Sequence, residues 1–179
     1  MDKGNPDGHH RNLKNDMSQS AEYKVEQSLV QLFNSITGLN VYTTNTTGSR
    51  LFPSVVISSR AREQLVSPYS GVFDVFTEIQ YSQTSARYTA SEFDDEYLNV
   101  FGSLYSQSPE LTAKMQDVSS GILFYMCRIS EQTPTILDNK KAWKRTIGIT
   151  SYVTPDENTV GLRDYEFDDF LNSFYLATI

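Results

Sequence analysis

The sequence predicts a single α+β domain, in which two to three helices pack on one face of an antiparallel or mixed sheet of about five strands. Its length of 179 residues is that of about one domain. Apolar residues recur at helical spacing in two long segments, whereas residues 72–81 alternate apolar and polar side chains as a half-buried strand does. The expected element order is one helix, three strands, two helices and two strands.

The first predicted element is a helix that follows a polar arm. Residues 1–20 contain only Leu13 and two methionines as apolar side chains, so we expect them to form a flexible arm. Ser20 is a candidate N-cap, and Gly38 supplies a C-terminal stop. Between them, apolar residues recur at helical spacing: Val25, Leu29, Leu32, Phe33 and Ile36. We therefore expect an amphipathic helix that opens a core domain over residues 21–155.

Three strands are expected next, over residues 39–43, 54–59 and 72–81. The second contains consecutive β-branched residues, and a polar connection (61–71) follows it. In the third, one set of alternating side chains is apolar enough to face the core, and the other set is more solvated. The inward set is Phe73, Val75, Thr77, Ile79 and Tyr81.

Two helices and two strands complete the predicted core. Thr89 and Glu92 have the spacing of a capping box and predict a second helix. Its expected buried stripe is Phe93, Tyr97, Val100, Phe101, Leu104 and Tyr105. Ser108 and Pro109 are the expected cap and first turn of a third helix over 110–118. Strands are expected over 122–129 and 141–153, separated by a loop, and the inward side chains of the last strand are Trp143, Ile147, Ile149 and Val153.

The composition argues for a protein kept in a cytoplasm-like compartment. The formal net charge is −7, which does not favour a nucleic-acid-binding surface. Cys127 is the only cysteine, so no intrachain disulfide is possible, and its apolar strand predicts a buried, inert thiol. We find no apolar run of signal-peptide length near the start and none long enough to cross a membrane.

The titratable residues do not predict an active site. His9 and His10, the two histidines, both lie in the expected arm, which removes histidine-based nucleophile and metal sites from the core. Paired carboxylates remain as the catalytic alternative, in an acid-pair hydrolase. One cluster sits where the helix dipole favours acids (Glu92, Asp94, Asp95 and Glu96), and Asp168 and Asp169 lie near the C-terminus. We therefore expect no catalytic, cofactor-binding or metal-binding residues, and not an enzyme.

One basic cluster accompanies an aromatic residue near the last strand. Lys140, Lys141, Lys144 and Arg145 surround Trp143. The cluster could contact a nucleic-acid backbone, but charges entering a strand more often mark a solvated sheet edge that resists mispairing. The edge interpretation is the one we favour.

The C-terminal extension (156–179) is both acidic and aromatic. It carries six acids and one Arg, for a net charge of −5. Its bulky apolar side chains predict a protein interface: Tyr165, Phe167, Phe170, Leu171 and Phe174. These side chains could pack on their own domain or on a neighbouring subunit, and the second is our hypothesis.

The core segments resemble a known family. They are the opening helix VEQSLVQLF (25–33), the Val41-Tyr42 strand, the segment FPSVVI (52–57), the alternating strand SGVFDVFTEIQYSQT (70–84) and the late strand WKRTIGI (143–149). In element order and strand character, residues 21–155 resemble the tail-terminator (tail-completion) and neck proteins of tailed bacteriophages.

The resemblance implies a structural role in a virion. Members form a ring, commonly a hexamer, that caps the tail tube and joins it to the head connector. It implies partners in other copies of the chain, in the tail-tube protein and in the head-connector or adaptor protein. DNA would pass through the lumen without sequence-specific binding, no membrane would be involved, and the ring would be assembled in the host cytoplasm. The alternatives are another head–tail connector component, or a non-catalytic regulatory module that binds a partner through its C-terminal aromatic arm.

Overall fold

A computed structural model describes residues 12–64, 71–119 and 121–154. These residues form three α-helices, one 3-10 turn and a six-stranded mixed sheet, so the predicted α+β class is confirmed. The elements in order are α1 (Asn12–Asn34), β1 (Asn40–Thr43), β2 (Ser54–Gln64), β3 (Phe73–Thr84), α2 (Ala90–Phe101), η1 (Gly102–Leu104), α3 (Ser108–Val118), β4 (Leu123–Gln132), β5 (Ile136–Asp138) and β6 (Ala142–Thr154).

The sheet is built around two long antiparallel strands. Its order is β1-β2-β3-β6-β4, and β3 pairs with β6 from Phe73↔Val153 to Thr84↔Ala142. Only β1 and β2 run parallel; the other pairs are antiparallel. The short strand β5 pairs with the start of β6 on the side that β4 occupies farther along, because β3 fills the other side. The prediction of a mostly antiparallel sheet is therefore right.

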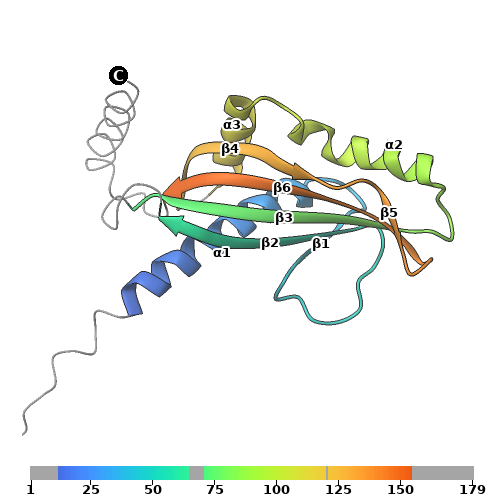
Figure 1. Ribbon diagram of the computed structural model, residues 1–179, viewed down its shortest axis with the longest axis horizontal. Helices are drawn as coiled ribbons and strands as arrows, with labels where there is room; N and C mark the ends of the chain where they lie inside the picture. The colour runs from blue at the N-terminus through green and yellow to red at the C-terminus, as the bar shows by residue number, and fades with distance from the viewer. Residues whose placement is uncertain (1–11, 65–70, 120, 155–179) are drawn as a thin grey trace, which may run out of the picture.

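All three helices bury their apolar side chains against the same face of the sheet. In Figure 1, α1 crosses behind the strands, α3 lies beside β4, and α2 lies toward the end of the sheet that carries β5. Two of them, α1 and α2, meet in an aromatic cluster, where the Phe33 ring of α1 lies 5.2 Å from that of Phe101 in α2. The Tyr81 ring of β3 stacks on Phe93 at 5.4 Å. The predicted inward sets of β3 and β6 line this helix-covered face.

Two element boundaries differ from the sequence-based expectation. α1 is already helical at Asn12, so residues 12–20 are not part of an arm, and Ser20 is not an N-cap. No glycine or proline interrupts these residues, so backbone hydrogen bonding continues through a polar stretch. β2 extends to Gln64 because it pairs along its whole length with β3, which has 12 residues to its 11, although residues 60–64 lack an apolar pattern.

The edge interpretation of the basic cluster is wrong. β6 lies between β3 and β4, and Lys140 belongs to the turn that precedes it. Lys144 pairs with Asp138 of β5. The Arg145 guanidinium lies 4.4 Å from the centre of the Tyr97 ring and 3.5 Å from the Asp94 carboxylate. Lys144 and Arg145 fit into an interior strand because each lies against an acidic side chain, and Arg145 also lies against an aromatic ring.

Three finer expectations also change. Tyr105 is 37% exposed and not part of the buried stripe. Ser108 does not cap α3, which begins after Gln107, and instead donates to the carbonyl of Cys127. Phe76 and Asp74, expected on a more solvated face of β3, are 5% and 9% exposed. The cover over Phe76 and Asp74 comes from side chains of neighbouring strands.

Candidate protein-binding surfaces

The residues predicted to form the protein interface lie outside the described part of the chain. They are Tyr165, Phe167, Phe170, Leu171 and Phe174. The body itself offers four surfaces to a partner: the two edges of the sheet, the sheet face without helices, and the end that carries the β5–β6 turn.

The outer edge of β2 is capped by two glutamates of α1. The Glu26 carboxylate accepts a hydrogen bond from the Ser59 backbone N–H at 2.7 Å, and the Glu22 carboxylate accepts one from the Ala61 N–H. The two acids are four residues apart on the helix, and the two N–H groups are two residues apart on the strand. One turn of α1 therefore replaces the carbonyl groups of a missing neighbour strand beyond β1.

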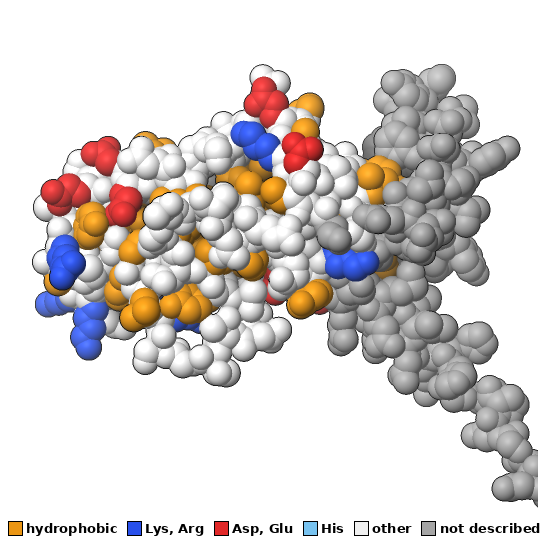
Figure 2. All heavy atoms as spheres, turned by 180° about the vertical axis from the view of Figure 1, so that it is seen from behind, with side chains coloured by type: hydrophobic (Ala, Val, Ile, Leu, Met, Phe, Trp, Pro, Cys, Tyr) orange, Lys and Arg blue, Asp and Glu red, His pale blue; other side chains and the backbone are white. Residues whose placement is uncertain are grey.

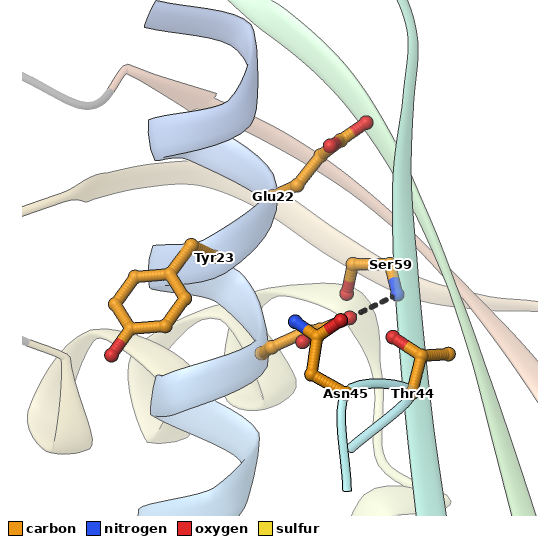
Figure 3. A pocket seen from close by; sticks show the side chains of 6 residues that line it. Glu22, Tyr23, Thr44, Asn45 and Ser59 are labelled. Atoms are coloured by element: carbon orange, nitrogen blue, oxygen red, sulfur yellow. Dashed lines mark hydrogen bonds between the residues drawn. The ribbon is translucent and has the colours of Figure 1, made fainter. Parts of the chain in front are cut away.

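A hollow of about 450 Å³ lies beside these caps. Figure 3 shows Glu22 and Tyr23 projecting from α1, and Thr44 and Asn45 approaching from the loop after β1. Burial raises the pKa of Glu26, and the nearby Glu22 charge adds to this, while the hydrogen bond from Ser59 opposes it. Both carboxylates already accept backbone hydrogen bonds, so the hollow reads as the flank of a capped edge.

The opposite edge of the sheet is capped in the same way by α3. The Cys127 N–H of β4 donates to the Thr112 hydroxyl at 2.8 Å, and the Cys127 carbonyl accepts from Ser108 at 2.8 Å. The side-chain carbonyl of Gln116 accepts from the Phe124 N–H at 2.8 Å. Ser108, Thr112 and Gln116 recur every four residues and so form one stripe of α3. Unpaired backbone N–H and C=O groups at a sheet edge can pair with a strand of another chain. At both edges, these side chains already hydrogen-bond some of those groups.

The sheet face without helices is centred on Phe76. A Cβ atom at Gly148 would lie 2.7 Å from the Phe76 ring, so the ring lies directly on the backbone of β6. The guanidinium groups of Arg60 and Arg62 lie 5.3 and 5.4 Å from the ring centre. Arginine at this distance is attracted to the ring's negative face. The small residue and the two arginines explain why an outward Phe is almost fully covered.

A polar network fixes one of these arginines. Arg62 donates to the Asp74 carboxylate at 2.9 Å and to the Thr150 hydroxyl at 3.1 Å. Thr150 donates in turn to Ser130 at 2.9 Å. On the same face, Arg128 lies opposite Thr150 and is exposed, without an ion pair among the described residues. The face therefore carries charged groups, one of them fixed by hydrogen bonds, around a buried aromatic ring.

The fourth surface, the hairpin end, combines exposed cations with exposed apolar side chains. We define it by Arg50, Leu51, Phe52, Arg87, Ile136, Leu137, Lys140 and Lys141. Ser85 donates hydrogen bonds to the carbonyls of Lys140 and Lys141, both at 3.0 Å, which holds the loop that carries Arg87 against the turn. In Figure 2, seen from behind, Lys and Arg side chains gather at the left-hand end, below a group of acidic side chains.

Four apolar side chains at the hairpin end are exposed to solvent. Leu51 is 66% exposed, Ile136 is 53% exposed, and Phe52 and Leu137 are each 43% exposed. Its four cations form no ion pair within the described residues. Apolar side chains beside charges are typical of surfaces that bind other proteins.

The predicted acidic cluster has structural roles. Glu92 completes the capping box with Thr89, whose hydrogen bonds hold the pKa of Glu92 below its ordinary value. Asp94 accepts from Thr135 and pairs with Arg145, and Glu96 accepts from Gln83 at 3.2 Å. Asp95 is exposed. These contacts fix α2 on the sheet.

The lone cysteine is buried, as predicted. Burial raises the pKa of the Cys127 thiol to about 12, although a contact with Ser151 works in the opposite direction. Such a thiol stays protonated and unreactive at neutral pH. Within the described ranges, no three His, Cys, Asp or Glu side chains gather as they would around a metal ion. No helix in those ranges is long and apolar enough to cross a membrane.

Comparison with known proteins gives no family assignment. No protein-family model matches the chain, and no curated protein matches it in sequence.

Proposed function

We propose that this chain is a structural subunit of a tailed-phage virion, a tail terminator or neck protein that assembles into a ring between the tail tube and the head connector. The observation that carries the proposal is the order of the elements. One helix, three strands, two helices and two strands are the pattern on which the resemblance rests, and the described residues follow this order with one further short strand, β5, between the last two.

The surfaces of the body fit such a role. A closed ring needs two different complementary surfaces on each subunit. Both sheet edges carry side-chain caps, so ring contacts through strand pairing are disfavoured at Ser59, Ala61 and Cys127. The helix-free face and the hairpin end remain as distinct surfaces. In this arrangement the helix-free face would meet the tube or connector, and the hairpin end would serve contacts between subunits.

The net charge of −7 supports the same role. A subunit that surrounds DNA without holding it gains from an acidic surface, since like charges weaken contact with phosphates. The mechanism is then geometric and needs no catalytic residue: one rim of the ring stops the tube from growing, and the other receives the neck.

A non-catalytic binding module that acts as a monomer is the second candidate. The arginines held on the Phe76 ring favour it, because a rigid arginine-bearing surface suits a single protein partner. The two candidates differ in what happens when the gene is lost.

Removing the gene from the genome that encodes the chain tests the proposal. We expect separate heads and tails of irregular length in electron micrographs, and normal particles when the native gene is supplied in trans. Normal infectious particles in its absence would contradict the virion role and leave the regulatory module as the better account.

A further inference from the structure

The occupant proposed for the hairpin end rests on the proposed ring. We propose that the hairpin end of one subunit receives the acidic, aromatic C-terminal extension (156–179) of the neighbouring subunit. This contact would close the ring head to tail.

Charge and side-chain type match across this contact. The extension has a net charge of −5 and contains five aromatic side chains among its acids. The hairpin end offers four exposed cations beside four exposed apolar side chains. Aromatic side chains could pack on Leu51, Phe52 and the β5 residues, while the acids face the lysines and arginines. Such complementarity fixes orientation and suppresses wrong partners.

The length of β6 sets how far the extension must run to reach the hairpin end of its own body. β6 starts at Ala142 beside the hairpin end and finishes at Thr154 at the other end of the sheet, as Figure 1 shows. At about 3.3 Å per residue this strand separates the two ends by roughly 40 Å. Asp164 follows Thr154 by ten positions, a maximum reach of roughly 35 Å. Asp164 therefore cannot reach its own hairpin end, but Asp168 and Asp169 follow Thr154 by 14 and 15 positions and can span up to roughly 50 Å, so the choice of a neighbour rests on the proposed ring.

The turn itself carries a lysine where glycine is the better residue. Asn139 and Lys140 have φ angles of 49° and 58°, and the Lys141 N–H donates to the Asp138 carbonyl at 2.9 Å. This is a two-residue hairpin turn with both central residues in the left-handed region. Glycine adopts that region without the steric conflict that a Cβ atom brings. A lysine here keeps a cation at the tip of the hairpin end.

Two reciprocal charge reversals in the full-length chain test the contact. One variant reverses the charge at the hairpin end (Lys140→Glu with Lys141→Glu), and the other reverses charge in the extension (Asp168→Lys with Asp169→Lys). The reversed residues lie in an exposed turn and in the extension. Far-UV circular dichroism and melting curves verify that each variant is folded. Each variant alone presents like charges at the contact. We expect the dissociation constant of the assembly to rise at least about tenfold in each, measured by sedimentation.

An equimolar mixture of the two variants distinguishes a contact with the neighbouring subunit from a contact within one chain. In the mixture each extension meets a neighbour of opposite charge, so the native assembly mass should return. A matched control reverses two cations on the helix-free face (Arg60→Glu with Arg128→Glu), and it should keep the native mass. The inference is overturned if the reversed-end variant assembles as the native chain does, if the control loses assembly equally, or if the mixture stays dissociated. A native chain that never assembles would instead overturn the proposed ring itself.

Discussion

At the scale of single residues, Gly148 and Phe76 form the pair on which the helix-free face depends. Phe76 points away from the helices, yet it is buried because the ring lies on the glycine backbone of the next strand. Any side chain at position 148 meets both the ring and the Cβ atom of Glu131, which would lie 3.1 Å away. Since the ring anchors Arg60 and Arg62, one missing Cβ atom shapes the centre of this surface.

Gly148→Ala should therefore destabilise the protein by about 1–3 kcal/mol, since the new methyl group overpacks a closed site. Urea unfolding measures the change. Gly102→Ala is the control, because a Cβ atom there has no neighbour within 4 Å, and it should change stability little. Adding Phe76→Leu to Gly148→Ala should recover part of the loss. Equal effects of the two alanine substitutions would show that the close contact is not the cause.

Lys140 gives the second prediction at this scale. Lys140→Gly should raise the free energy of unfolding by up to about 1 kcal/mol, because glycine accepts the positive φ angle. Lys141→Gly, outside the pair of positive-φ residues, should not stabilise the protein. Thermal melting measures both. A Lys140→Gly variant that melts lower than the native chain would contradict the strain argument.

At the scale of elements, the helices act as edge caps as well as covers for the core. α1 and α3 each place polar side chains at four-residue spacing along an outer strand, Glu22 and Glu26 on β2, and Ser108, Thr112 and Gln116 on β4. The same helices bury Val25, Leu29, Leu111 and Met115 on adjacent faces. An amphipathic helix thus carries an apolar stripe for the core and a polar stripe that protects the edge.

Glu26 makes the cap testable through pH. The pKa of Glu26 is raised in the folded state, mainly by burial, so the folded protein holds this proton more tightly than the unfolded chain does. Its contribution is therefore favourable at low pH and is lost as pH rises through the folded pKa. Glu26→Gln keeps a carbonyl oxygen for Ser59 and removes the charge. We expect the stability that the variant gains over the native protein to increase as the pH rises above about 4, where the glutamate of the unfolded chain begins to ionise.

Glu26→Ala is the contrasting change for the same cap. It leaves the Ser59 N–H without its partner and should destabilise the protein by about 1–3 kcal/mol. Urea unfolding at several pH values measures both variants. If glutamine and alanine behave alike, the hydrogen bond to Ser59 is not what Glu26 supplies.

At the scale of the whole molecule, the sequence predicted the class and the core better than the surfaces. The alternation along β3 leaves only one face apolar enough to point inward, which assigns Phe73, Val75, Ile79 and Tyr81 to the core. The spacing of Thr89 and Glu92 marks the start of a helix. The side-chain caps at the sheet edges were not predicted from the sequence, although the polar side chains next to the apolar stripe of α1 could have indicated them. The Phe76 centre could not be predicted, because it needs the register that puts Gly148 beside the ring.

The central claim is that copies of this chain close into a ring. Sedimentation velocity of the full-length protein, from dilute solution to the highest soluble concentration, measures it most directly. The account predicts one discrete assembly, six times the 20.3 kDa mass of the chain for a hexamer, that dissociates as salt screens the contact at the hairpin end. A single 20.3 kDa species at every concentration would contradict it.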